Sequence, residues 1–328
     1  KAMNRKTIWM LILFTLASVH PAEAQPKTVP RIGLLIGGHS ASDLARIEAF
    51  RQGLGELGYA EGENIFIEYR YGDHQKRKRG LVELAADLVS FQVDVIVALD
   101  SSSTRAAKKT TGTIPIVTRA SDNPVEAGLV TSLARHGGNI TGVYSITEEL
   151  TGKRLQLLKE ANPRLARVGV LWNPNFRASY SFKEAQFAAM SLDLQLQSLE
   201  VRLSEDLERA FRTAISDRAQ AIVTLWTPLI FYERKRIAAL AIKSGLPAMY
   251  EDREFVNVGG LMSYGANTQD LCKRVAFYVD KILKGAKPGD LPVERATKFE
   301  LVINLNTAKQ IGLTIPPNML ARADKVIK

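Results

Sequence analysis

The feature that most constrains the fold is an internal duplication of short apolar runs. Residues 31–35 in the first half are matched by residues 167–171 in the second. Two further matched pairs follow in the same order, 95–99 with 221–225 and 114–117 with 246–249. Short apolar runs bounded by turn residues are typical of buried β-strands. The sequence therefore predicts two structural units built on one plan.

Helical patterns separate these runs. In the first half, Leu44, Ile47, Phe50 and Leu54 recur at three- and four-residue spacing, and the second half has a looser version around Phe182. Buried strands that alternate with helices indicate parallel sheets covered on both faces by right-handed crossovers. Each half is therefore predicted to be a doubly wound α/β lobe. A single Rossmann-like domain or a barrel is the alternative, and the repeat after four strands argues against both.

The chain continues beyond the second half, which two independent lobes would not require. A strand at 261–264, a helix at 270–283 and a strand at 299–304 are expected there. These additions allow crossings between the lobes near 143–144, 264–265 and 298–299, and several crossings form a hinge about which rigid lobes can close. The predicted lobes are 29–143 plus 265–298, and 144–264 plus 299–328.

Residues 1–24 have the pattern of a cleavable signal peptide. A basic stretch precedes an apolar run at 8–19 that is too short to span a bilayer, and Ala22-Glu23-Ala24 supplies the small residues that signal peptidase accepts. Cleavage before Gln25 would release about 304 residues. An uncleaved anchor or a buried helix is the alternative. Because the residue directly after the cleavage site is Gln25 and not a cysteine, we expect a soluble periplasmic protein, not a lipid-anchored one.

Composition fits an ordinary globular chain, with 46% hydrophobic and 24% charged residues. The net charge of +10 raises the question of nucleic acid, and the densest basic run is at 76–79. This run is interpreted as a solvated helix face, because no aromatic interleaving and no nucleic-acid motif accompany it. Cys272 falls in a helical apolar pattern and is expected to be buried core.

Catalytic, metal and cofactor motifs are not found. His20, His39, His74 and His136 lack the partners of a zinc site. Neither G-x-S-x-G nor a nucleotide-binding glycine loop occurs in the sequence. We therefore expect a binding protein without catalytic residues, metal or cofactor.

The fold itself predicts where a ligand binds. In open parallel sheets, ligands lie beyond the carboxyl ends of the strands. The corresponding loops are 37–42, 100–104, 119–123, 173–180, 226–228 and 250–253, with Tyr264 at a crossing. The candidate ligand-binding residues in them are Gly38, His39, Ser40, Ser101, Ser102, Ser103, Asp122, Asn123, Asn173, Asn175, Trp226, Thr227, Tyr250, Glu251 and Tyr264.

The residue types suggest the chemistry of the ligand. Hydroxyls at 101–104 begin a predicted helix, where they can hold a carboxylate or simply cap the helix. Trp226, Tyr250 and Tyr264 can stack on an aromatic ligand or pack in the core. Asp122 or Glu251 can pair with an ammonium group. Trp172 ends a strand and is expected to be core.

Four separated segments give the chain a family resemblance. They are residues 123–130 followed by 137–142, then 152–155, then 259–265, and finally 299–304 running to 312–317. The mature chain resembles the type I periplasmic binding fold, and specifically the substrate-binding proteins of tryptophan/tyrosine-type ABC transporters. One departure is that Asn123 stands where the family's Gly-Asp-Pro has its acid, so the family's ligand chemistry does not transfer directly.

The resemblance implies a periplasmic solute-binding component of an uptake transporter that captures a small ligand by lobe closure and docks on ABC permease subunits. An aromatic amino acid is the first ligand expected, and a related carboxylate the next. A ligand-sensing input module for a membrane receptor or kinase is the alternative, and a secreted enzyme is a weaker one. Transcriptional regulators share the fold, but their N-terminal helix-turn-helix is replaced here by the signal segment. We expect a monomer that does not bind nucleic acid.

Overall fold

The computed structural model describes residues 29–38, 41–72, 80–135, 137–146, 150–174 and 176–328. Among these residues, six strands form a first sheet in the order β11-β5-β4-β3-β1-β2, and all neighbours run parallel. The strands are β1 (Arg31–Ile36), β2 (Phe66–Tyr71), β3 (Val95–Ala98), β4 (Ile116–Ala120), β5 (Ile140–Tyr144) and β11 (Val293–Arg295).

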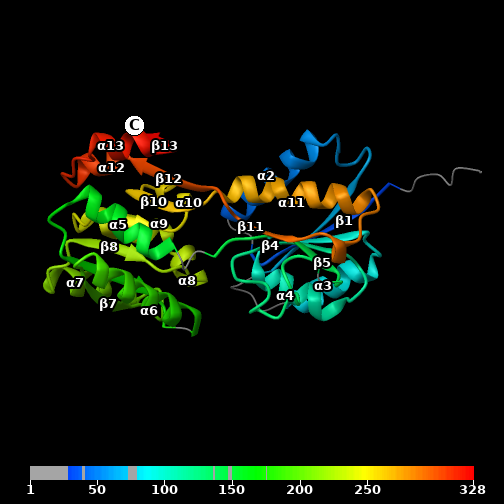
Figure 1. The fold of residues 1–328 in the computed structure, drawn as a ribbon, viewed down its shortest axis with the longest axis horizontal. Coiled ribbons are helices and arrows are strands. Elements are labelled where there is room, and N and C mark those ends of the chain that lie inside the picture. Colours follow the sequence, from blue (N-terminus) through cyan, green and yellow to red (C-terminus); the bar gives the residue numbers. More distant parts are fainter. Residues whose placement is uncertain (1–28, 39–40, 73–79, 136, 147–149, 175) are drawn as a thin grey trace, which may run out of the picture.

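Helices cover both faces of this sheet (Figure 1). On one face lie α2 (Ala41–Glu56) and α11 (Thr268–Leu283), which pack together and share one apolar cluster with the sheet. On the other face lie α3 (Leu81–Ser90) and α4 (Ser101–Thr110), which share a second cluster. Strands buried from both sides explain why their sequences are apolar throughout.

The second sheet has the order β13-β12-β10-β9-β8-β6-β7 among the described residues. Its strands are β6 (Arg167–Trp172), β7 (Gln195–Glu200), β8 (Ala221–Thr224), β9 (Ala248–Tyr250), β10 (Met262–Ala266), β12 (Phe299–Asn304) and β13 (Lys325–Ile327). Its helices are α5 (Thr151–Ala161), α6 (Phe176–Ser191), α7 (Asp206–Ser216), α8 (Pro228–Tyr232), α9 (Arg234–Lys243), α10 (Arg253–Asn257), α12 (Leu305–Gln310) and α13 (Pro317–Arg322).

The duplication is visible in the strand order. β2-β1-β3-β4 in the first sheet corresponds to β7-β6-β8-β9 in the second, with the same connectivity. The predicted fold class, two doubly wound α/β lobes, is confirmed. Strand β12 corrects the expectation of a purely parallel sheet, since it pairs antiparallel with β10. The chain enters β12 from the other lobe and therefore runs opposite to its neighbour.

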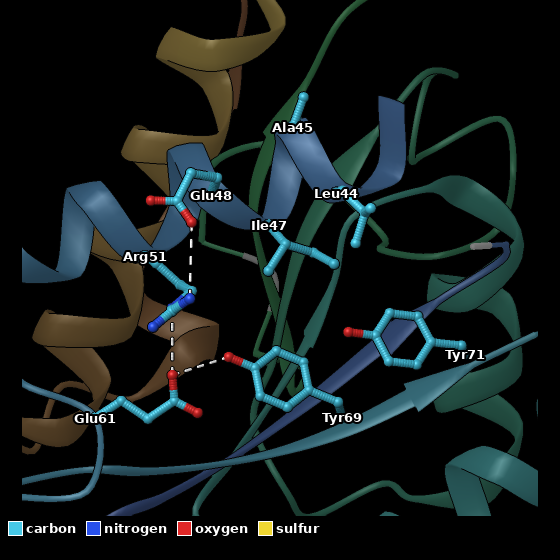
Figure 2. Close-up of a pocket in the computed structure, with 8 residues that line it drawn as sticks. All are labelled: Leu44, Ala45, Ile47, Glu48, Arg51, Glu61, Tyr69 and Tyr71. Carbon is cyan, nitrogen blue, oxygen red and sulfur yellow. Dashed lines mark hydrogen bonds and ion pairs between the residues drawn. The ribbon is translucent and has the colours of Figure 1, made fainter. Parts of the chain in front are cut away.

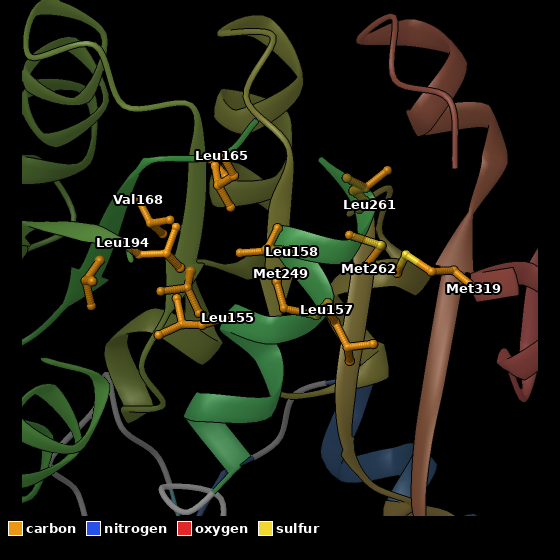
Figure 3. Close-up of a cluster of buried hydrophobic side chains, with 14 of the residues drawn as sticks. Leu155, Leu157, Leu158, Leu165, Val168, Leu194, Met249, Leu261, Met262 and Met319 are labelled. Carbon is orange, nitrogen blue, oxygen red and sulfur yellow. The ribbon is translucent and has the colours of Figure 1, made fainter. Parts of the chain in front are cut away.

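The chain passes between the sheets after β5, after β10 and between β11 and β12. The second lobe has a core of its own between α5 and the sheet, where Leu155, Leu158, Val168 and Met249 meet (Figure 3). Met319 of α13 joins the same cluster, so the C-terminal segment packs onto this lobe. No helix within the described ranges is long and apolar enough to cross a membrane. The signal-peptide prediction, residues 1–24, lies outside those ranges.

Candidate functional site

A cavity lies where the two lobes meet. Arg46 of α2, Arg119 of β4, Ser121 and Ser145 line it from the first lobe, and the second lobe and the crossing after β10 complete it with Trp226, Glu251, Asp252, Ala266 and Thr268. It offers about 20 Å³ to the centres of water molecules, which is room for about one ordered water. The lobes must therefore separate before a larger solute can enter.

Three polar atoms at this cavity are buried and, within the described part of the chain, have no hydrogen-bond partner. They are Arg119 Nε, Ser145 Oγ and Glu251 Oε1. The three residues are 7%, 2% and 3% exposed. An unpartnered buried polar group costs about 1–3 kcal/mol. Three such groups on residues that line one cavity indicate a missing polar partner, because stable interiors leave few of them.

Arg119 carries the positive charge of the site. Its Nη2 donates to Thr268 Oγ1 at 3.2 Å, and this hydroxyl lies 3.4 Å from Asp252 Oδ2. Burial, together with the charge of Arg46, lowers the pKa of the Arg119 guanidinium. Arginine stays protonated in proteins nonetheless. The cavity therefore contains a desolvated cation, which favours an anionic group on the ligand.

Glu251 follows β9 and carries the acid of the site. Its Oε2 accepts a hydrogen bond from Thr224 Oγ1 at 2.8 Å. Burial raises the pKa of Glu251 to about 7, although the charge of Arg154 and the Thr224 hydrogen bond act in the opposite direction. Near neutral pH, both the acid and the carboxylate forms are populated. Burial rather than a neighbouring charge is the main cause of the shift.

A contact between the lobes lies beside the cavity. The guanidinium carbon of Arg46, in the first lobe, is 5.4 Å from the centre of the Phe231 ring in α8. Arg234 of the second lobe is also stacked on this ring, at 4.9 Å. Cation–π contacts of this type contribute about 0.5–2 kcal/mol. Trp226, which precedes α8, is half-buried and lines the cavity.

A buried charge network supports the second lobe behind the cavity. Arg154 of α5, which is 1% exposed, donates from Nε to the Tyr264 carbonyl oxygen at 2.8 Å. Arg253 pairs with Glu300 at 3.4 Å, and Asn267 donates to the same carboxylate at 3.0 Å. The first contact joins α5 to β10, and the other two join β12 to α10 and to the start of α11.

The serines at 101–103 have a structural role in this conformation. The N-cap of α4 is Asp100, which accepts from the Ser103 backbone N–H at 2.8 Å and from the Gly37 N–H at 2.9 Å. Ser103 Oγ donates to the same carboxylate, and Ser101 Oγ donates to Asp122. A carboxylate accepts several N–H groups at once, which makes it an effective cap. None of the three serines lines the cavity, and Ser102 is exposed.

Two further predicted residues stabilise the neighbouring loop. Asp122 pairs with Arg105 at 3.0 Å in addition to Ser101. Asn123 accepts from the Val125 N–H at 3.1 Å and donates to Glu126 at 3.0 Å, so it holds its own turn. From this loop, Ser121 lines the cavity, whereas Asp122 and Asn123 do not. The Ser121 backbone N–H donates to Ser101 Oγ.

The predicted tyrosines also lie away from the cavity. Tyr250 is fully buried and stacks on Phe255, with ring centres 4.6 Å apart. Side chains alternate along a strand, so Tyr250 and Met249 enter different cores on opposite faces of the sheet. Tyr264 is half-buried, 6.2 Å from the Phe299 ring. Trp172 is core, as expected, and stacks on Phe182 at 4.7 Å.

The other predicted residues are placed as follows. Thr227 caps α8 by accepting from the Ile230 N–H at 3.3 Å. Asn173 donates to the Arg202 carbonyl oxygen at 3.4 Å, and Gly38 is buried after β1. The predictions for His39, Ser40 and Asn175 lie outside the described residues. Of the predicted residues that are described, Trp226 and Glu251 line the cavity.

Sequence reasoning missed most of the cavity. Arg119, Ser121 and Asp252 lie in loops that it marked as facing the ligand, so a preference for charged and hydroxyl side chains would have found them. Ser145 comes directly after β5, Ala266 ends β10 and Thr268 begins α11, so all three lie where the chain passes between the lobes. No local sequence pattern marks Arg46 as a cavity residue, because it lies within helix α2 and not in a loop after a strand.

A second hollow lies on the first lobe alone, between α2 and the edge strand β2 (Figure 2). Its volume is about 800 Å³, and it is open to solvent. Arg51 pairs with Glu61 at 3.2 Å, and the Tyr69 hydroxyl donates to the same carboxylate at 3.0 Å. These polar groups therefore satisfy one another, in contrast to those of the interlobe cavity.

Cys272 is completely buried in α11, as the sequence predicted. Burial raises the pKa of its thiol, so we expect no modification of the native protein by a thiol reagent at about pH 8. In concentrated guanidinium chloride the same reagent should modify the one cysteine of the chain. Mass spectrometry after alkylation checks this expectation. Stoichiometric reaction of the folded protein would contradict it.

No group of His, Cys, Asp and Glu among the described residues could hold a metal ion.

Comparison with known proteins identifies the family. The family model described as ABC transporter substrate binding protein matches residues 35–327. A tyrosine-binding protein of Clostridioides difficile is 27% identical over 279 residues, 84% of this chain and 78% of that protein.

Two solved structures each cover 91% of this chain and 99% of their own. A conserved domain protein from Vibrio cholerae has a TM-score of 0.80 at 28% identity. An ABC domain in complex with L-Trp from Streptococcus pneumoniae has a TM-score of 0.79 at 25% identity. The chain belongs to the ABC transporter substrate-binding proteins and is a component that captures a small solute.

Proposed function

We propose that the interlobe cavity binds an α-amino acid as a zwitterion. The observation that carries this proposal is that three residues lining one cavity each keep a buried polar atom with no hydrogen-bond partner in the described chain. The Arg119 N–H and the Ser145 hydroxyl are donors suited to a carboxylate, and the Glu251 oxygen is an acceptor suited to an ammonium group. Arginine forms the stronger, charge-assisted type of hydrogen bond with a carboxylate.

An aromatic side chain on the ligand is the favoured choice. Trp226 lies at the cavity, and its indole ring can pack on another ring. Two relatives support this choice, the tyrosine-binding protein and the domain solved with L-Trp. The lobes that close on the ligand are residues 29–143 plus 265–298 and residues 144–264 plus 299–328. Contacts made only in the closed form would shift the balance between open and closed states.

The family match supports a proposal for the cellular setting. Substrate-binding proteins of ABC transporters work outside the cytoplasm, and their partners are transporter subunits. For this chain we propose periplasmic export through a cleaved signal at residues 1–24, followed by docking of a monomer on the permease, with neither catalysis nor nucleic-acid binding. The family match does not favour the sensor alternative.

Isothermal titration calorimetry with four compounds tests the ligand class. We expect L-tyrosine or L-tryptophan to bind, and tyramine and 3-(4-hydroxyphenyl)propanoate to bind about 30-fold more weakly or worse. Tyramine lacks the carboxylate and leaves Arg119 unpaired, while the propanoate lacks the ammonium group and leaves Glu251 unpaired. Losing one partner of a buried charged pair costs about 2–5 kcal/mol, and every 1.4 kcal/mol is about tenfold in affinity. Equal affinity for all four compounds would exclude recognition of a zwitterion.

A further inference from the structure

We propose that ligand capture releases one proton from Glu251, so that the affinity of this protein for an amino acid falls as the solution becomes more acidic. This inference rests on the proposed function and adds regulation to the same site. Its structural basis is the asymmetry of the Glu251 carboxyl group. One oxygen, Oε2, accepts from Thr224, and the other, Oε1, is buried at the cavity with no partner in the described ranges.

The charges around Glu251 come from several elements. Asp252 is adjacent in sequence, and Arg154 approaches from α5 behind the cavity. Arg46 of α2 and Arg119 of β4 line the same cavity from the first lobe. Strand β10 contributes Gly265, which has no side chain, directly against the Glu251 backbone. The cavity therefore contains two arginines and two acids before any ligand enters.

In the empty cavity, desolvation favours the neutral acid. Burial raises the pKa of Glu251 to about 7, and the neighbouring Asp252 acts in the same direction. Arg154 and Thr224 oppose this shift without reversing it. Between about pH 4.5 and about pH 7, the closed and empty form consequently holds a proton on this side chain, whereas a solvated glutamic acid would have lost it.

An ammonium group beside Glu251 Oε1 would instead favour the ionised form of this side chain. An opposite charge within about 4–6 Å stabilises the carboxylate and lowers its pKa. In this step, the neutral carboxylic acid of Glu251 and the ammonium group of the ligand form a carboxylate–ammonium pair. The carboxylic proton passes to water. Because the empty form holds more protons than the complex below about pH 7, acidification must weaken binding.

Calorimetry with L-tryptophan as the probe, from about pH 5.5 to about pH 8.5, tests the proposal. The affinity should fall by up to about tenfold for each unit below about pH 7 and be level above it. Titrations in buffers of different ionisation enthalpy should show a release of protons on binding that is largest at the acidic end of this range and falls toward zero at the alkaline end.

Two variants assign the proton. Glu251→Gln imitates the protonated acid, so it should bind weakly and with no dependence on pH in this range. Thr224→Val removes a hydrogen bond to the carboxylate and should move the break in the pH profile upward. Glu254→Gln is the matched control, because burial also raises the pKa of Glu254 but Glu254 does not line the cavity. It should keep the wild-type profile.

The outcomes separate the two proposals. Tight binding of L-tryptophan with an affinity independent of pH would overturn the proton linkage and leave amino-acid binding intact. A pH profile that survives in Glu251→Gln would overturn the assignment to Glu251. No binding of any amino acid at any pH would overturn the proposed function and this inference together. Circular dichroism at each pH verifies that the chain stays folded.

Discussion

Replacing Arg119 with methionine is expected to weaken amino-acid binding by about 100-fold or more while leaving the chain folded. Methionine keeps an unbranched apolar side chain and removes the guanidinium that would meet the ligand carboxylate. Binding should suffer because a desolvated carboxylate would lose its cation. Folding should suffer little, because the hydrogen bond of the buried Arg119 guanidinium to Thr268 is to a neutral hydroxyl, and the nearby positive charge of Arg46 repels it.

Calorimetry with L-tryptophan measures the loss, and thermal unfolding measures the stability. Arg105→Met is the matched control, since this arginine also lies in the first lobe but is about half exposed and pairs with Asp122 away from the cavity. Because Arg105 does not line the cavity, its loss should change the affinity little. An Arg119→Met variant that binds within threefold of the wild type would place the ligand elsewhere.

Replacing Gly265 with alanine is expected to destabilise the protein by about 3 kcal/mol or more. A Cβ at Gly265 would lie 1.9 Å from the carbonyl oxygen of Glu251. This oxygen belongs to the backbone, so the chain at Glu251 and strand β10 would have to move apart. The change would also displace Glu251, and the fraction that still folds should bind the ligand poorly.

Urea unfolding of the two proteins checks this expectation. The matched control is Gly55→Ala in helix α2, where an added Cβ meets nothing within 4 Å. Alanine is a better helix former than glycine, so this control should be neutral or stabilising by up to about 1 kcal/mol. A Gly265→Ala protein as stable as the wild type would show that the strands can separate here without cost.

Much of the fold could be predicted from local patterns. Apolar runs bounded by turns marked β1, β3, β6 and β8, because strands buried on both faces must be apolar throughout. Strands β11 and β13 were not predicted, since each has three residues and no distinctive pattern. The direction of β12 depends on which lobe the chain comes from, and no local periodicity contains that information.

The candidate site was less predictable. The hydroxyls at 101–103 were the strongest sequence indication of a ligand-binding loop. In the structure, Ser101 donates to Asp122 and Ser103 donates to Asp100. Tyr250 was predicted from its place at a strand end, but the pleat of the strand turns its ring into the core. Of the residues predicted to bind a ligand, Glu251 and Trp226 line the cavity, because they follow strands β9 and β8 at their carboxyl ends.

The sequence by itself determined the two-lobed α/β architecture and the edge at which each lobe presents its loops, since both follow from the periodicity of neighbouring residues. Only the tertiary structure decided which side chains share the cavity. Arg46, Ser145, Glu251 and Thr268 come from distant parts of the chain. They meet because the chain crosses between the two lobes. The unmet hydrogen bonds of Ser145 and Glu251 arise only in the folded chain, where burial has removed water from both side chains.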